Sequence, residues 1–152
     1  MGSYLNPGNS GFSNMRNDVY VDKTEMISLI NQTINTPRNL TCISRPRRFG
    51  KSFAAKMLCA YYDKTCDSKE LFDDLKIAKD DEYLKYLNQY DVIYLDMASV
   101  LGVTSSEDAV SYVKRNITEE VLDIYSEVKE AEALFDTLAN LVIYTGNKII
   151  MI

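Results

Sequence analysis

The chain has 152 residues, 46% of them hydrophobic, which suits one ordinary globular domain and excludes a disordered chain. It contains no histidine, which excludes a histidine general base, a Ser-His-Asp triad and mixed Cys/His zinc sites. The net charge of −5 is uneven: residues 1–52 hold seven Lys/Arg against three Asp/Glu, and residues 53–152 hold ten against nineteen. A compact basic spot suits a small polyanion better than a nucleic acid, which needs an extended basic face; a solvated basic loop is an equal alternative.

The first third of the chain predicts one helix and one strand before a basic loop. Residues 1–18 are rich in Asn, Gly and Ser, so we expect an irregular lead-in there. Asp22 stands at the cap position of a helix that Pro37 closes. Residues 40–43 are apolar and rich in β-formers, which predicts a strand. A helical pattern then begins at Ser52.

The rest of the chain continues to alternate helices with strands. The expected elements are short helical segments near 68–75 and 80–88, a strand at 91–97, a helix from a Ser105 or Ser106 cap to Tyr125, a helix at 130–144 that stops at Gly146, and a strand at 148–152. This alternation indicates the α/β class with a parallel sheet.

Residues 44–52 read Ser-Arg-Pro-Arg-Arg-Phe-Gly-Lys-Ser, and their end matches the close of the GxxxxGK[ST] phosphate loop, the Walker A motif. Gly50 has no side chain, so backbone N–H groups can turn onto phosphate oxygens. Lys51 places an ammonium against the β- and γ-phosphates, and the Ser52 hydroxyl coordinates Mg²⁺. A bare Gly-Lys-Ser is a weak signal, but the strand before it and the helix after it form the required frame. Arg45 replaces the first glycine, which leaves a chance loop as the alternative.

At these residues the sequence resembles the bacterial and archaeal AAA-ATPase-like proteins, which often carry a PD-(D/E)XK nuclease-like domain further along the chain. The resemblance rests on residues 4–8 (YLNPG), 20–24 (YVDKT) and 45–52 (RPRRFGKS), and it extends over essentially the whole chain. In that family an arginine takes the first-glycine position, so Arg45 becomes a match.

The resemblance implies a P-loop NTPase-like three-layer sandwich with a parallel sheet, and it makes residues 1–152 the N-terminal part of a single P-loop ATPase domain. The family has an apolar strand that ends in acidic residues, and residues 148–152 look like its start. We therefore expect a fragment that lacks the later strands and the acidic cluster, and that binds ATP and Mg²⁺ without useful turnover.

The expected nucleotide-binding residues are Arg47, Arg48, Phe49, Gly50, Lys51, Ser52 and Phe53, with Ser52 as the metal ligand and no catalytic residue. Asp96 ends an apolar strand and imitates a Walker B acid, but we interpret it as a strand-end residue near the site. Asp22 and Lys23 could lie near the nucleotide base, but we prefer the interpretation that Asp22 caps a helix.

The sequence also predicts partners and location. No signal peptide or membrane-length run is present, and three cysteines without a CxxC spacing indicate free thiols, so we expect a cytoplasmic protein with no membrane partner. No direct nucleic-acid contact is expected. An unpaired edge at 148–152 predicts self-association, unless that strand pairs with residues 40–43. The rival function is an interaction scaffold with a vestigial loop; no nuclease signature is discernible.

Overall fold

The computed structural model describes residues 2–44, 46 and 49–152. The chain divides into two compact units, one made of Met1–Pro7 with Asp91–Ile152 and the other of Gly8–Tyr90. We call the first the sheet unit and the second the helical unit, and each is described by itself. No helix in the described part of the chain has the length and apolar character needed to cross a bilayer.

Within its described residues, the helical unit packs six short helices around buried aromatic rings. They are α1 (Ser10–Arg16), α2 (Glu25–Asn31), α3 (Lys51–Tyr62), α4 (Lys69–Phe72), the 3₁₀ helix η1 (Lys76–Lys79) and α5 (Tyr83–Tyr86). Phe12 stacks on Phe72 with ring centroids 4.9 Å apart, and Tyr61 meets Phe72 edge-on at 5.4 Å. These three rings are completely buried, so helices too short to be stable alone are held by their shared core.

Buried polar side chains in the helical unit have hydrogen-bond partners. The Asp63 carboxylate is fully buried and accepts the Gly8 N–H at 2.6 Å and the Thr65 hydroxyl at 2.7 Å. The Asn88 amide donates to the backbone oxygens of Ala60 and Asp63 at 3.1 and 2.6 Å. These bonds tie the end of α3 to the loops that pack on it and avoid the cost of burying unpaired polar atoms.

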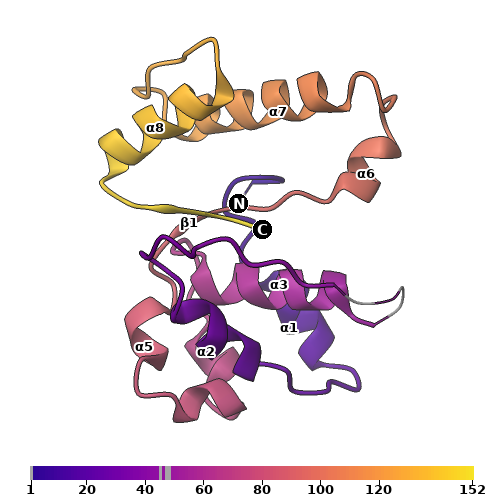
Figure 1. Ribbon diagram of the computed structural model, residues 1–152, viewed down its shortest axis with the longest axis vertical. Coiled ribbons are helices and arrows are strands. Elements are labelled where there is room, and N and C mark those ends of the chain that lie inside the picture. Colours follow the sequence, from indigo (N-terminus) through magenta and orange to yellow (C-terminus); the bar gives the residue numbers. More distant parts are fainter. Residues whose placement is uncertain (1, 45, 47–48) are drawn as a thin grey trace. The chain divides into compact units, whose positions relative to one another are not determined.

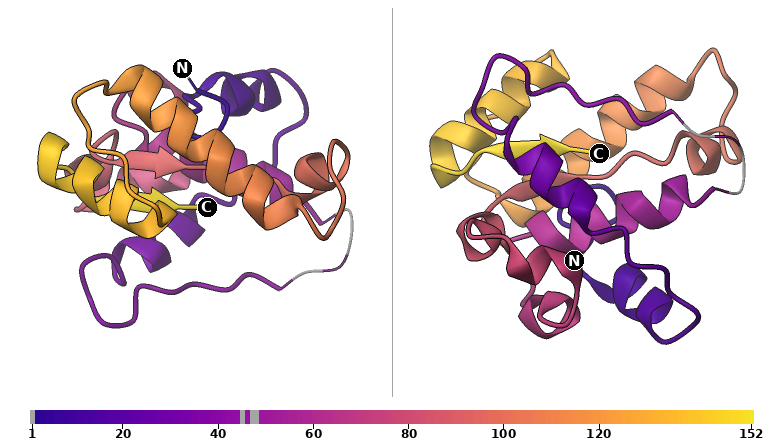
Figure 2. Two further views of the ribbon diagram at one scale, coloured as in Figure 1. Left: turned by 90° about the horizontal axis from the view of Figure 1, so that it is seen from above. Right: turned by 60° about the horizontal axis from the view of Figure 1, so that its bottom comes forward.

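The sheet unit contains two parallel strands and three helices. They are β1 (Asp91–Ile93), α6 (Met97–Leu101), α7 (Ala109–Ile124), α8 (Leu134–Thr145) and β2 (Ile149–Met151). Val92 stands opposite Ile150 in the parallel pair, and Leu5 forms an antiparallel bridge to Ile93 on the other side of β1. Figures 1 and 2 show α7 and α8 side by side along the strands.

The core of the sheet unit lies between these helices and the strands. Its buried members are Leu5, Ile93, Ile117, Val121, Val128 and Leu141. Gly146 ends α8 with φ +70°, a left-handed conformation that favours glycine, as the sequence predicted. The parallel pairing and the covering helices agree with the expected α/β class.

Residues 40–43 do not form the expected strand. They carry no regular secondary structure, and Leu40 is 94% exposed. A strand needs a hydrogen-bonded neighbour, and the only sheet within the described residues consists of β1 and β2. Among the described residues, the segment 40–43 therefore has no neighbouring strand to pair with, despite its β-forming composition.

Other boundaries also differ from the expectation. Residues 1–18 are not irregular throughout, because they include α1 and the paired Leu5. The strand expected at 91–97 ends at Ile93, and α6 begins at Met97. The residue that caps α7 is Asp108 rather than Ser105 or Ser106; Ser105 donates its hydroxyl proton to that aspartate at 2.8 Å.

Candidate functional site

The N-terminal end of α3 begins on a left-handed glycine. Gly50 is the N-cap residue with φ +76° and ψ +27°, a conformation that residues with a Cβ adopt only under strain. The first intrahelical bond runs from the Ala54 N–H to the Gly50 oxygen at 2.9 Å. The N–H groups of Lys51, Ser52 and Phe53 therefore precede the α-helical ladder and point out of the helix end.

The charge at this helix end is positive. No side chain caps α3, and its first turn contains no acidic residue. The partial positive charge of the helix dipole and the Lys51 ammonium therefore act together at one place. Lys51, Ser52 and Phe53 are exposed, so a ligand can reach them. The predicted contacts of Arg47 and Arg48 lie outside the described residues, as does Arg45.

Two hollows in the helical unit adjoin this helix end. The larger has a volume of about 520 Å³ and is lined by side chains that include Val19, Tyr20, Val21, Phe49 and Phe53. The smaller, of about 300 Å³, includes Asp22, Glu25, Leu29 and Lys51. Both hollows share Lys23, Phe49, Gly50 and Ala54, so they meet at the glycine.

Lys23 reaches this glycine from the segment before α2. A Cβ built on Gly50 would lie 3.7 Å from the Lys23 ammonium nitrogen. The sequence indicated that Lys23 could lie near a nucleotide base, but it gave no reason to expect the Lys23 ammonium beside Gly50. The one sequence signal for this contact is that Lys23 follows Asp22, whose side chain fixes the backbone of this segment by hydrogen bonds.

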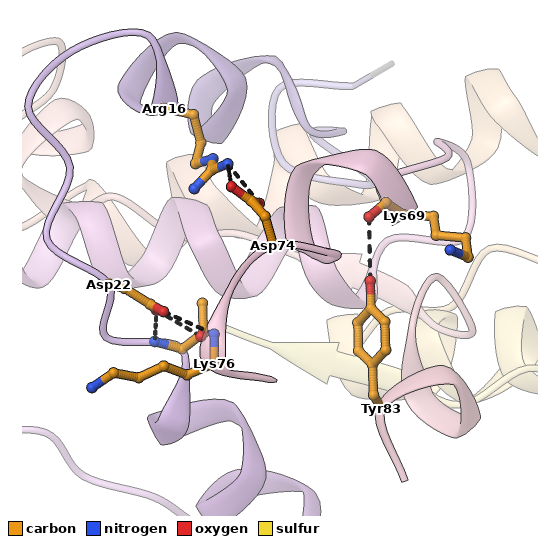
Figure 3. A network of polar contacts seen from close by, with 7 residues as sticks. Arg16, Asp22, Lys69, Asp74, Lys76 and Tyr83 are labelled. Carbon is orange, nitrogen blue, oxygen red and sulfur yellow. Dashed lines mark hydrogen bonds and ion pairs between the residues drawn. The ribbon is translucent and has the colours of Figure 1, made fainter. Parts of the chain in front are cut away.

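The sequence suggested that Asp22 caps a helix, but its side chain instead fixes the segment before α2 through hydrogen bonds. The N-cap of α2 is Thr24, whose N–H and hydroxyl both donate to Asp22 Oδ1 at 2.9 and 2.7 Å. Asp22 Oδ2 accepts the Lys76 N–H at 2.8 Å, so the carboxylate ties this segment to η1 (Figure 3). Burial raises the pKa of Asp22, but the hydrogen bonds from Thr24 and Lys76 together outweigh it and hold that pKa below its usual value.

Asp96 caps a helix in the sheet unit. Its Oδ1 accepts the N–H groups of Ala98 and Ser99 at 3.0 and 3.3 Å, and its Oδ2 accepts the Ser99 hydroxyl at 3.1 Å. Both carboxylate oxygens are thus used at the start of α6, which is the usual task of an N-cap aspartate. The sequence up to Asp96 resembles a strand that ends in a metal ligand, because aspartate is common both as a helix N-cap and as a metal ligand.

The sequence model of one protein family, described as "Predicted AAA-ATPase", matches residues 7–152. The chain belongs to this AAA-ATPase-like family. The resemblance read from the three short stretches is therefore confirmed over nearly the full length. No curated protein and no solved structure matches the chain.

In this member of the AAA-ATPase-like family, the described residues that lead into α3 and form its first turn are Phe49–Phe53. These residues provide outward N–H groups, one ammonium and one hydroxyl at an exposed helix end. Such an arrangement fits a phosphate group and a divalent cation, because the N–H groups and ammonium favour anions and the hydroxyl oxygen is a hard ligand.

Proposed function

We propose that this chain binds ATP together with Mg²⁺ at the N-terminal end of α3. The observation that carries the proposal is the left-handed Gly50 followed directly by Lys51 and Ser52 in a first turn without acidic residues. The family assignment supports it, because an AAA-ATPase-like chain would use a nucleotide and Mg²⁺. For the domain as a whole we propose the P-loop sandwich, which the parallel pairing of β1 and β2 supports.

The residues have separate roles in this proposal. The N–H groups at the start of α3 bind phosphate oxygens, and the Lys51 ammonium neutralises the β- and γ-phosphates. The Ser52 hydroxyl is a ligand of Mg²⁺, which when bound would offset further phosphate charge. The nucleoside occupies the hollow of about 520 Å³, whose exposed Phe49 and Phe53 rings offer flat apolar faces.

Calorimetry with Mg-ATP tests the proposal. Replacing Lys51 with Ala removes a charge-assisted contact to phosphate, which should cost about 1.5–3 kcal/mol, or roughly a ten- to hundredfold loss of affinity. Lys79→Ala is the matched control, because Lys79 is an exposed lysine on η1 that lines neither hollow. Equal affinity of the wild type and Lys51→Ala would overturn the assignment, and a complete absence of binding would favour the scaffold function.

We also propose that this chain binds ATP without useful turnover, and we assign no catalytic residue. The support is that both oxygens of Asp96, the one Walker B-like acid of the sequence, accept hydrogen bonds at the start of α6. Phosphate release from Mg-ATP should therefore stay near the uncatalysed background. Steady release that disappears in Asp96→Asn would instead place this carboxylate in a catalytic site.

A further inference from the structure

The Lys23 side chain lies against the phosphate loop. Its ammonium nitrogen is 3.7 Å from the position that a Cβ of Gly50 would take, and Lys23 lines both hollows that meet there. The residue is exposed, so its ammonium is accessible to a ligand. It forms no ion pair with any carboxylate in the described part of the chain.

The backbone of Lys23 is held in place on both sides. Asp22 bonds to Thr24 and to the Lys76 N–H, and Thr24 is completely buried. The Thr24 hydroxyl oxygen accepts the Ile77 N–H at 3.1 Å, and the Lys23 oxygen accepts the Met26 N–H at 3.1 Å. Only the side chain of Lys23 remains to be ordered when a ligand binds, which lowers the entropic cost of binding.

The neighbouring carboxylates do not account for the position of the Lys23 ammonium near Gly50. Both oxygens of Asp22 accept hydrogen bonds, and Glu25 pairs with the Lys76 ammonium at 2.8 Å. Lys51 lines the same hollow of about 300 Å³ as Lys23. Two lysines therefore line one hollow, and a polyanion bound there would attract both side chains.

We infer that Lys23 is a second phosphate-binding cation of the site, and that its ammonium contacts the phosphate chain of the nucleotide beside Gly50. The inference rests on the proposed function and adds a binding residue to it. The ligand class is a nucleoside triphosphate, and the part recognised by Lys23 is the polyphosphate rather than the base. Inorganic tripolyphosphate therefore contains the group that this lysine binds.

The test measures calorimetric affinities for Mg-ATP and for Mg-tripolyphosphate. Lys23→Gln removes the charge and keeps most of the stem, and we expect about a tenfold loss for both ligands, as for one charge-assisted hydrogen bond. Lys23→Arg keeps a cation and should retain most of the affinity, whereas Lys79→Gln should have no effect. The salt dependence of binding should also weaken in Lys23→Gln, since one fewer cation meets the phosphates.

The other outcomes separate this inference from the proposed function. If Lys51→Ala loses affinity while Lys23→Gln binds both ligands as the wild type does, the nucleotide site stands and the role of Lys23 is refuted. If Lys23→Gln weakens Mg-ATP but not Mg-tripolyphosphate, the lysine serves the nucleoside, and the inference also fails. If the wild type binds neither ligand, both proposals fall. Denaturant midpoints of all variants confirm that each one is folded.

Discussion

The side chain of Asn6 holds the buried carboxylate of Asp91: its Nδ2 donates to Asp91 Oδ1 at 2.8 Å, and its Oδ1 accepts the Val92 N–H at 2.8 Å. Asn6 is only 3% exposed and Asp91 is fully buried. The Tyr125 hydroxyl donates to the same Asp91 oxygen at 3.4 Å. One amide therefore satisfies a buried acceptor and a buried donor of β1 at once.

We expect Asn6→Ala to lower the free energy of unfolding of the sheet unit by about 3 kcal/mol, because it leaves a buried carboxylate and a buried N–H without this partner. Urea titration followed by circular dichroism measures the loss. Asn6 has φ +52°, so Asn6→Gly separates backbone strain from the lost amide and should keep most of the effect. Tyr125→Phe should cost less, about 1 kcal/mol, and a larger loss there than in Asn6→Gly would contradict this ranking.

Replacing Gly50 or Gly146 by Ala gives a matched pair of variants. Their φ angles are +76° and +70°, so replacement by Ala strains each backbone by about 1–2 kcal/mol. A Cβ at Gly50 would meet Lys23, whereas nothing lies within 4 Å of one at Gly146. Both variants should lose similar stability in thermal unfolding, but only Gly50→Ala should weaken Mg-ATP binding in calorimetry. An equal effect of both on binding would mean that the loss is a general consequence of destabilisation.

Stability should fall at alkaline pH. Burial, together with a smaller effect of the nearby Asp63, raises the pKa of the Cys59 thiol to about 12, and burial raises the pKa of Tyr61 to about 12. Both groups bind their proton more tightly in the folded state, so this contribution is complete below the ordinary pKa values of 9.0 and 10.0. It is lost progressively as the pH rises from about 9 toward 12.

Free energies of unfolding at pH 8, 9.5 and 10.5 test the alkaline prediction, and they should decrease along this series. Cys59→Ala removes one of the titrating groups, so its slope against pH should be shallower than that of the wild type. A stability that is flat over this range would show that these groups reach solvent in the folded state.

The outer edge of β2 should support self-association. Lys148 and Ile152 bond toward β1, with Asp91 N–H to Lys148 O at 3.2 Å and Ile152 N–H to Ile93 O at 2.8 Å. Backbone groups of alternate strand residues face opposite edges, so the Met151 N–H points away from β1. Within the residues that the structure describes, no strand pairs with this edge of β2.

We expect the molar mass from light scattering to rise with protein concentration for the wild type. Met151→Pro removes the outward N–H and should restore a monomer, because proline cannot donate to an added strand. Ile150→Val is the control, since the Ile150 backbone faces β1 and its side chain stays apolar. A monomer at all concentrations would show that this edge is closed.

Much of the fold followed from local chemistry. The end of α8 at Gly146 and the two parallel strands depend on a glycine conformation and on apolar runs that are visible in the sequence. The helix predicted from Ser52 begins one residue earlier, at Lys51. The strand at 40–43 was wrong because strand formation depends on a neighbour that local composition does not reveal. The first 18 residues were misjudged because their turn-forming composition concealed Phe12, which is completely buried.

The candidate site, too, could be predicted from the sequence only in part. The sequence predicts a phosphate site at Gly50, Lys51 and Ser52, because that chemistry depends on adjacent positions in the chain, and this assignment stays a prediction. It missed the approach of Lys23 to Gly50, because that contact depends on how the anchored segment before α2 packs in the helical unit. Asp96 was ambiguous because an N-cap and a metal ligand cannot be distinguished by residue type alone.

The way in which the two units divide the chain affects how it matures during translation. The helical unit is the continuous stretch Gly8–Tyr90, whereas the sheet unit combines Met1–Pro7 with residues that are synthesised after it. A nascent chain paused just after Tyr90 leaves the ribosome could already bury its aromatic core. Leu5 and Asn6, made before the helical unit, would still lack β1, so they would remain open to proteases and chaperones until residues 91–152 are synthesised.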